Sequence, residues 1–280
     1  MDSTELLELD EFVELFNVKI KESNEVKSIE DSIINVINKP VKQTGINSGI
    51  KKLDKFSDGW KNGELIFIGV SPEYNKSGLA KTLLLNPVVN DEKSIGYFSN
   101  NSNINNELGA MCLSYSGLFN STFENGIEVL TKAPIHLNCN AKISINELTH
   151  SIYLLKEKYD IDQIIIEDFD YIFHTDKELS KTQSERVILK ALKKSVNLFN
   201  IPIIVLNYTP IDREVLDLGR LKISNEVENL ADLILLLRKT QDMYGVSKIE
   251  LNFSKYIDNE LKNVAVKYNR GFNFFTDEDS

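Results

Sequence analysis

Short apolar runs alternate with amphipathic segments along most of this chain. Runs with the length and unbroken apolar character of buried strands lie at residues 64–70, 94–99, 163–168, 201–207 and 232–238. Between them, apolar residues recur at helical spacing, which predicts helices over residues 76–86, 104–118, 145–159 and 183–199. Strands that alternate with helices are typical of a parallel sheet covered by helices. The pattern therefore predicts an α/β fold with a mostly parallel sheet.

Local signals mark where two of these helices begin. Ser144 with Glu147, and Thr182 with Glu185, have the spacing of capping boxes. In such a box the hydroxyl and the carboxylate each accept a hydrogen bond from a backbone amide of the first turn. We therefore expect one helix to begin beside each pair.

The two ends of the chain depart from the alternating pattern. Segments 248–256 and 263–270 have strand-like composition, and the short polar link between them predicts an antiparallel hairpin. Near the N-terminus, segment 28–40 predicts an amphipathic linker helix that Pro40 ends. Its apolar stripe consists of Ile29, Ile33, Val36 and Ile37.

Charge is distributed unevenly. Of the formal net charge of −10, residues 1–40 contribute −6 and the tail contributes −3, so the stretch between them carries only −1. The sequence predicts an acidic extension with the linker helix over 1–43, a core domain over 44–275 and an acidic tail over 276–280. A nearly neutral core neither indicates nor excludes nucleic acid.

Composition excludes several classes of protein. The 280 residues, 42% hydrophobic and 26% charged, are typical of a soluble globular protein. No apolar run reaches the length of a membrane span, and the acidic N-terminus lacks the basic start of a signal peptide. Cys112 and Cys139 are not spaced as a pair, so we expect free thiols, no zinc site and a cytoplasmic location, bacterial or viral-host.

The first candidate for chemistry is "GVSPEYNKSGLA", residues 69–80. Lys76 and Ser77 stand between a strand and a helix, as in a phosphate-binding loop. Val70 and Asn75 replace the two glycines of that motif. Asn75 is expected to tolerate a left-handed backbone, although its side chain would crowd a phosphate. The residues alone leave two interpretations, a nucleotide site or a structural turn with Lys76 in solvent.

Two further candidates stand where strands end, the edge at which α/β sheets bind ligands. Asp168 ends the run "QIIIED", as a Walker B carboxylate would do. Asn207 and Tyr208 end the run "IPIIVLNY", where a polar group could sense a γ-phosphate. Each signal by itself equally describes a buried strand that ends in solvated polar residues.

The ordered set of segments is more specific than any one motif. "TGINSGIKKLDKFSDGW", "IGYFSN", "PIHLN", "IIIEDFDYI", "IPIIVLN" and "ENLADLILLLRK" resemble, in order, the RecA-type motor domain of DnaB-family replicative helicases, from Thr44 to Phe275. The resemblance implies a RecA-like core that uses ATP and Mg²⁺, binds ATP between subunits of a ring and threads single-stranded DNA through the centre. The linker helix would dock on a neighbouring subunit, or else fold back on its own core.

The resemblance also implies residue roles. Lys76 would bind phosphate, while Ser77 and Asp168 would hold Mg²⁺. Lys255 would lie at the subunit interface, in the stretch that carries the family's arginine finger. A pore loop would contact DNA through Arg213, Arg220 and Lys222, and His174, Lys177 and Lys181 follow the Walker B strand. Solvated surface charge is the alternative for both of these groups, and His136 and His150 are expected to be structural.

Catalytic positions depart from the family pattern. Its glutamate base falls in the stretch 100–102, which reads Asn-Asn-Ser, and no acid follows until Glu107. Its glutamine falls on Tyr208, and its arginine finger falls on Ile257. A missing base costs roughly 10²–10⁴ in rate and a missing finger roughly 10³–10⁵, without simple additivity. We therefore expect negligible hydrolysis, because Asn101, Tyr208 and Ile257 replace catalytic parts, and weak or absent ATP binding, because Asn75 crowds the loop.

Three classes of function remain open at this stage. The first is a helicase-associated or regulatory subunit in DNA replication, with itself or a replicative helicase subunit as partner. The second is an active ATP-dependent DNA helicase with unusual catalytic residues. The third is another RecA-fold ATPase, of the recombinase or clock type. ATP turnover in the presence of single-stranded DNA separates the first two.

Overall fold

The structure is a computed structural model that describes residues 45–209, 224–241, 247–255 and 263–278. The expected extension and linker helix, and the loop that carries Arg213, Arg220 and Lys222, lie outside these residues. Within the described part, no helix is long and apolar enough to cross a membrane.

Every strand that the apolar runs predicted is present. The strands are β1 (Leu65–Val70), β2 (Ile95–Ser99), β3 (Ile135–Cys139), β4 (Ile143–Ser144), β5 (Gln163–Ile166), β6 (Ile172–Phe173), β7 (Ile203–Tyr208), β8 (Leu233–Gln241), β9 (Ser247–Lys255), β10 (Asn263–Asn269) and β11 (Phe274–Asp277). The helices are α3 (Lys51–Ser57), α4 (Lys76–Asp91), α5 (Ile104–Leu118), α6 (Phe123–Lys132), α7 (Ile145–Tyr159), α8 (Lys181–Phe199) and α9 (Asn225–Leu230), with the 3₁₀ turn η1 (Phe169–Tyr171).

The main sheet has the strand order β11-β10-β9-β8-β1-β7-β5-β2-β3 among the described residues. From β8 to β3 the neighbours are parallel, and from β8 to β11 they are antiparallel. The expected hairpin is therefore β9 and β10, extended on both sides by β8 and β11. This confirms the predicted fold class, a mostly parallel sheet with antiparallel C-terminal strands.

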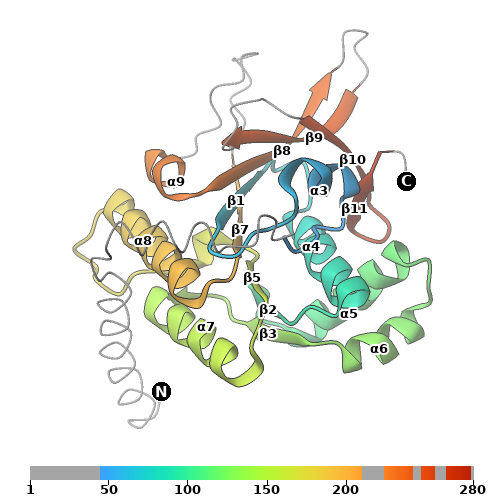
Figure 1. Ribbon diagram of the computed structural model, residues 1–280, viewed down its shortest axis with the longest axis horizontal. Coiled ribbons are helices and arrows are strands. Elements are labelled where there is room, and N and C mark those ends of the chain that lie inside the picture. Colours follow the sequence, from blue (N-terminus) through green and yellow to red (C-terminus); the bar gives the residue numbers. More distant parts are fainter. Residues whose placement is uncertain (1–44, 210–223, 242–246, 256–262, 279–280) are drawn as a thin grey trace, which may run out of the picture.

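Helices cover both faces of the sheet (Figure 1). One face packs against α3, α4 and α5 in an apolar core that includes Leu83 and Ile165. The opposite face packs against α7 and α8 in a second core that includes Ile166 and Leu192. Since successive residues of a strand point to opposite faces, each central strand contributes side chains to both cores. The unbroken apolar runs are the result of this two-sided burial.

Two expected helix boundaries are wrong. The α8 capping box is formed by Ser180 and Gln183, not by Thr182 and Glu185, because the Ser180 hydroxyl accepts the Gln183 amide and the helix begins at Lys181. Helix α4 continues beyond residue 86 and contains Pro87, whose buried ring packs in the core while the helix loses one backbone hydrogen bond. The Ser144–Glu147 box is confirmed.

The last strand ends at Asp277, so β11 includes the first two residues of the expected acidic tail. The Asp277 carboxylate is 7% exposed and accepts hydrogen bonds from the amides of Lys51, at 2.9 Å, and Lys52, at 3.0 Å. It therefore caps the N-terminus of α3 from the far end of the chain, where a negative charge also favours the helix dipole.

We expect Asp277→Ala to lower the free energy of unfolding by about 1–2 kcal/mol, because two amides of α3 lose their acceptor. Glu278→Ala is the matched control, since this neighbouring acid is exposed. Urea unfolding followed by circular dichroism measures both variants. Equal stability of the two variants would contradict the capping role.

Candidate functional site

The turn between β1 and α4 holds the first group of predicted residues. Asn75 is the N-cap of α4, and its side-chain oxygen accepts the Gly78 amide at 3.3 Å. Its backbone is extended, with φ −83°, so Asn75 does not adopt the left-handed conformation that it was expected to tolerate. The physical reason is that a capping residue needs extended dihedrals for its side chain to reach back to the helix. Asn75 thus takes up an amide that a bound phosphate would use.

Lys76 points to the end of the neighbouring β5. Its side chain is 3% exposed, and its ammonium forms an ion pair with the Asp168 carboxylate, N to O 2.6 Å. The same carboxylate oxygen accepts the Asn100 side-chain amide at 2.8 Å, and the other oxygen accepts the Asp170 backbone amide at 3.1 Å. The Tyr208 ring lies over the ammonium, 4.4 Å from nitrogen to centroid. Four residues that the sequence analysis singled out therefore meet here.

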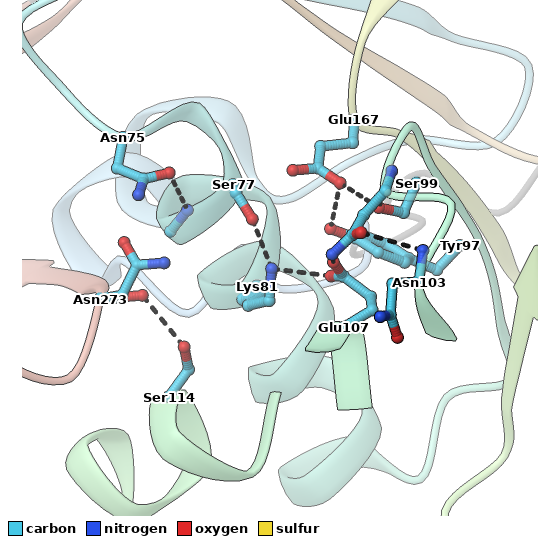
Figure 2. Close-up of polar contacts among 12 residues, drawn as sticks. Asn75, Ser77, Lys81, Tyr97, Ser99, Asn103, Glu107, Ser114, Glu167 and Asn273 are labelled. Carbon is cyan, nitrogen blue, oxygen red and sulfur yellow. Dashed lines mark hydrogen bonds and ion pairs between the residues drawn. The ribbon is translucent and has the colours of Figure 1, made fainter. Parts of the chain in front are cut away.

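A second lysine of α4, Lys81, lies one turn after Ser77 (Figure 2). Lys81 is fully buried, and its ammonium donates to the Ser77 hydroxyl and forms an ion pair with Glu107, N to O 2.7 Å. The other Glu107 oxygen accepts the Asn101 side-chain amide at 3.2 Å. Removing one partner of such a buried pair typically costs about 3–5 kcal/mol, since the other charge is left unpaired.

A third carboxylate, Glu167, is 4% exposed and directly precedes Asp168. One of its oxygens accepts the Ser99 hydroxyl at 2.6 Å and the Tyr97 hydroxyl at 3.2 Å (Figure 2). Alternation along β5 places Glu167 on the same face as Ile165, which is the face that α4 covers. Burial, reinforced by Glu167, raises the pKa of Tyr97 well above its ordinary value.

Sequence reasoning missed Lys81 and Glu167 and treated Glu107 only as a distant acid. Lys81 occupies an interior position of α4 among apolar residues, and an unpaired lysine there would be costly. That position was the available signal for a buried partner. The sequence offered no signal for Glu167, because alternation puts Glu167 and Asp168 on opposite faces and only the structure shows which face α4 covers.

The turn between β10 and β11 closes over the start of α4. A Cβ at Gly78 would lie 2.4 Å from the Asn273 side-chain oxygen, so only glycine allows this approach. The Asn273 carbonyl accepts the Ser114 hydroxyl at 3.0 Å, and its side chain accepts the Tyr268 hydroxyl at 2.9 Å. The antiparallel end of the sheet therefore forms one wall of the site.

The resemblance implies ATP and Mg²⁺. The side chains of the site fit a phosphate group better than they fit a magnesium ion. Lys76 and the first-turn amides of α4 fit an anion, provided that Asp168 and Asn75 give up these donors. Magnesium does not fit the arrangement as it stands, because the Ser77 hydroxyl and the Asp168 carboxylate already face ammonium groups. Among the described residues, no group of three or more His, Cys, Asp or Glu side chains gathers as a metal cluster.

Other predicted residues lie away from this cluster or outside the described part. Lys255 ends β9 opposite Ile234, and nothing is described of its side chain. Lys177 and Lys181 are exposed near the start of α8, and His174 accepts the Asp176 amide at 3.1 Å. The loop with Arg213, Arg220 and Lys222, and the Ile257 position, remain predictions. His136 stacks on Tyr159, with centroids 4.0 Å apart, consistent with packing.

The family model and the similar known proteins point to the same protein family. The family model for the DnaB-like helicase C terminal domain matches residues 45–277. The replicative DNA helicase DnaB of Mycoplasma pneumoniae is 24% identical over 248 residues, 78% of this chain and 51% of that protein. The corresponding protein of Mycoplasma genitalium is 22% identical over 263 residues, covering 83% of this chain and 56% of that protein. The chain thus spans about half the length of these curated relatives.

Solved structures agree on the fold. A DnaB-like replicative helicase, solved in a study of its interactions with primase, superposes with a TM-score of 0.73 at 16% identity, over 90% of this chain and 67% of that chain. The ATPase domain of G40P gives 0.74 at 16% identity, over 90% and 99% of the two chains. A KaiC-like protein from Pyrococcus horikoshii gives 0.62 at 14% identity, over 85% and 99%.

The Cys139 thiol, at the end of β3, has a pKa that depends on the nearby carboxylates of Glu107 and Glu167. Burial, with the Glu107 and Glu167 carboxylates, raises the pKa of Cys139 to about 11. In a Cys112→Ser variant we expect alkylation by iodoacetamide near pH 8 to be about 100-fold slower than for an ordinary cysteine, because so little thiolate is present. Mass spectrometry measures the rate, with urea-unfolded protein as the control. Equal rates for folded and unfolded protein would refute the raised pKa.

Proposed function

The chain belongs to the DnaB-like helicase C-terminal domain family, and on that premise we propose that it acts in DNA replication as a helicase-associated or regulatory subunit. In this role it binds ATP weakly and hydrolyses it at a negligible rate. Because the chain covers about half of its curated relatives, their complete activity is not carried over.

The observation that carries the proposal is the way the charged groups are paired. Lys76, the only lysine at the loop's phosphate position, is ion-paired with Asp168 and covered by the Tyr208 ring. An incoming phosphate chain has to displace that carboxylate, and the two anions compete for one ammonium. This competition lowers the affinity for ATP.

The residues after β2 support slow hydrolysis. A general base must accept a proton from the attacking water, which a carboxylate does and a side-chain amide does not. Asn100 and Asn101 present amides, and they bind Asp168 and Glu107. Glu107 is itself ion-paired with the buried Lys81. Loss of a general base alone removes roughly 10²–10⁴ in rate.

One observation favours the alternative of an active helicase. Glu167 is a carboxylate without a lysine partner among the described ion pairs, and it lies on the face of the sheet that α4 covers. A carboxylate there would serve as a base if a nucleotide drew the loop open. The third class, a recombinase or clock-type ATPase, is supported only by the shared fold of the KaiC-like structure.

The expected ATPase activity is negligible, with or without single-stranded DNA. We expect turnover to lie at least about 100-fold below the ordinary enzyme range of 1–10³ s⁻¹, for want of a base. Lys76→Ala is the control for contaminating enzymes, since it removes the phosphate lysine. Release of phosphate, followed by a coupled assay, measures both proteins.

Turnover at a helicase's rate that Lys76→Ala abolishes would overturn the proposal. In that event Glu167→Gln decides whether Glu167 is the base, since glutamine keeps the size and one acceptor oxygen of the side chain. A loss of about 100-fold or more in kcat with an unchanged KM for ATP would support the active helicase.

Association is the second part of the proposal. The apolar stripe of the predicted linker helix, segment 28–40, would offer four apolar side chains whose burial is worth roughly 6–10 kcal/mol before ordering costs. That is enough to hold a second copy of the chain or a replicative helicase subunit. Single-stranded DNA remains a further proposed partner, through Arg213, Arg220 and Lys222.

We expect Ile33→Asp with Ile37→Asp to abolish association while leaving the core folded, because both substitutions place charge on the apolar stripe. Asn35→Asp with Asn38→Asp adds the same charge away from the stripe and serves as the control. Analytical ultracentrifugation, alone and with the host's replicative helicase, measures the effect. A wild-type chain that sediments as a monomer in both cases contradicts the proposal.

A further inference from the structure

The contact between Lys81 and Ser77 has a consequence for the metal that this family uses. Lys81 is fully buried in α4, and its ammonium donates to the Ser77 hydroxyl (Figure 2). In a phosphate-binding loop, the hydroxyl at the Ser77 position is a ligand of Mg²⁺. A positive charge of the chain itself thus lies against the oxygen that a divalent cation would need.

Lys81 is fixed in this position. Its ammonium has three donors and no acceptor, and it is paired with Glu107 at 2.7 Å where both side chains are almost completely buried. Moving the ammonium away from Glu107 would leave two buried charges without partners, which is strongly unfavourable. A magnesium ion would therefore have to bind beside a cation that cannot withdraw.

The carboxylates of the site already have partners, so they do not offset the repulsion between Lys81 and a magnesium ion. Asp168 neutralises Lys76 at 2.6 Å and also accepts the Asn100 amide, while Glu107 neutralises Lys81. Magnesium binds through unpaired oxygen ligands and dehydrates reluctantly. Glu167 accepts two hydroxyls with one oxygen and lies in the core beside Tyr97. The Lys81 ammonium, held by Glu107, is therefore the cationic group that contacts the Ser77 hydroxyl.

We infer that the Lys81 ammonium stands in for the divalent cation, so that the site takes nucleoside polyphosphates in their metal-free form. This inference rests on the proposed function only in that the site binds nucleotide, however weakly. Lys81 is then a positioning residue that occupies the Ser77 hydroxyl in place of the ion, and Glu107 is the group that holds it. Nucleotide binding is then independent of Mg²⁺. In other phosphate-binding loops, the hydroxyl at the position of Ser77 is a ligand of the metal.

The test measures binding of the fluorescent, hydrolysis-resistant analogue mant-AMP-PNP to the full chain, in excess Mg²⁺ and in excess EDTA. For the wild type we expect the two Kd values to agree within about twofold. The double variant Lys81→Met with Glu107→Gln removes both charges without leaving either one unpaired, and frees the Ser77 hydroxyl. For it we expect Mg²⁺ to tighten binding by about tenfold or more.

A matched control uses the exposed pair on α6. Lys132→Met with Glu128→Gln makes the same two chemical changes at a pair 3.1 Å apart on the surface, and we expect it to behave as the wild type. Circular dichroism and thermal unfolding show whether each variant is folded. If the double variant at the site does not fold, Lys81→Leu with Glu107→Leu replaces the buried pair by apolar groups and is measured in the same way.

Each outcome decides the inference. Wild-type binding that Mg²⁺ tightens about tenfold overturns it, since Lys81 then does not replace the ion. A wild type that binds the analogue in neither condition also overturns it, since the site then does not take metal-free nucleotide. A double variant whose binding Mg²⁺ does not tighten overturns it as well, since Lys81 is then not what keeps the ion out. ATP turnover plays no part in this test, so failure of the proposed function, which turnover decides, is distinguished from failure of the inference.

Discussion

Parallel pairing at the centre of the sheet is the constraint on which the site depends. β1 pairs with β7, β7 with β5, and β5 with β2, all in the same direction. Parallel strands end at one edge, so the turn after β1 and the residues after β5 and β2 meet there. Lys76 and Asp168 lie about ninety residues apart in the chain. They come within contact distance because their strands end at the same edge.

The same edge concentrates charge in a place with little water. Two ammonium groups and three carboxylates lie near the start of α4, and Lys81, Glu107 and Glu167 are almost completely buried. Buried charges need ion-pair or hydrogen-bond partners to be tolerated, so each lysine takes one carboxylate and Glu167 is held by two hydroxyls. Any anionic ligand competes with these internal partners, and any cation competes with the lysines. The internal pairing therefore sets the chemistry of the site more than the backbone of the loop does.

Fold and chemistry are thus separable in this chain. The RecA-like arrangement of strands follows from the two-sided burial of five apolar runs, which many different side chains at the sheet edge would permit. Asn75, Asn100 and Asn101 are compatible with that fold, since each finds a local hydrogen-bond partner in the helix cap or in a neighbouring carboxylate. The sheet edge can be kept while the function of its side chains changes.

The sequence by itself determined the order and type of the central elements, because burial periodicity is a local property of the chain. It also located Lys76, Ser77, Asp168 and Tyr208 at strand ends and helix starts. It missed short elements such as α6 and β3; the five residues of β3 are only partly buried, so they do not form a fully apolar run. It also expected Asn75 to tolerate a left-handed backbone that the residue does not adopt, since a cap depends on how the following helix begins.

Only the tertiary structure decided which charges pair. Lys81 and Glu107 come from different helices, and nothing in the spacing of 26 positions indicates that their side chains meet at 2.7 Å. The choice between Glu167 and Asp168 likewise depended on where β5 ends and which face α4 covers. Ion pairing acts through space between segments distant in sequence, whereas apolar periodicity acts along the chain. For this reason the fold could be predicted from the sequence and the electrostatics of the site could not.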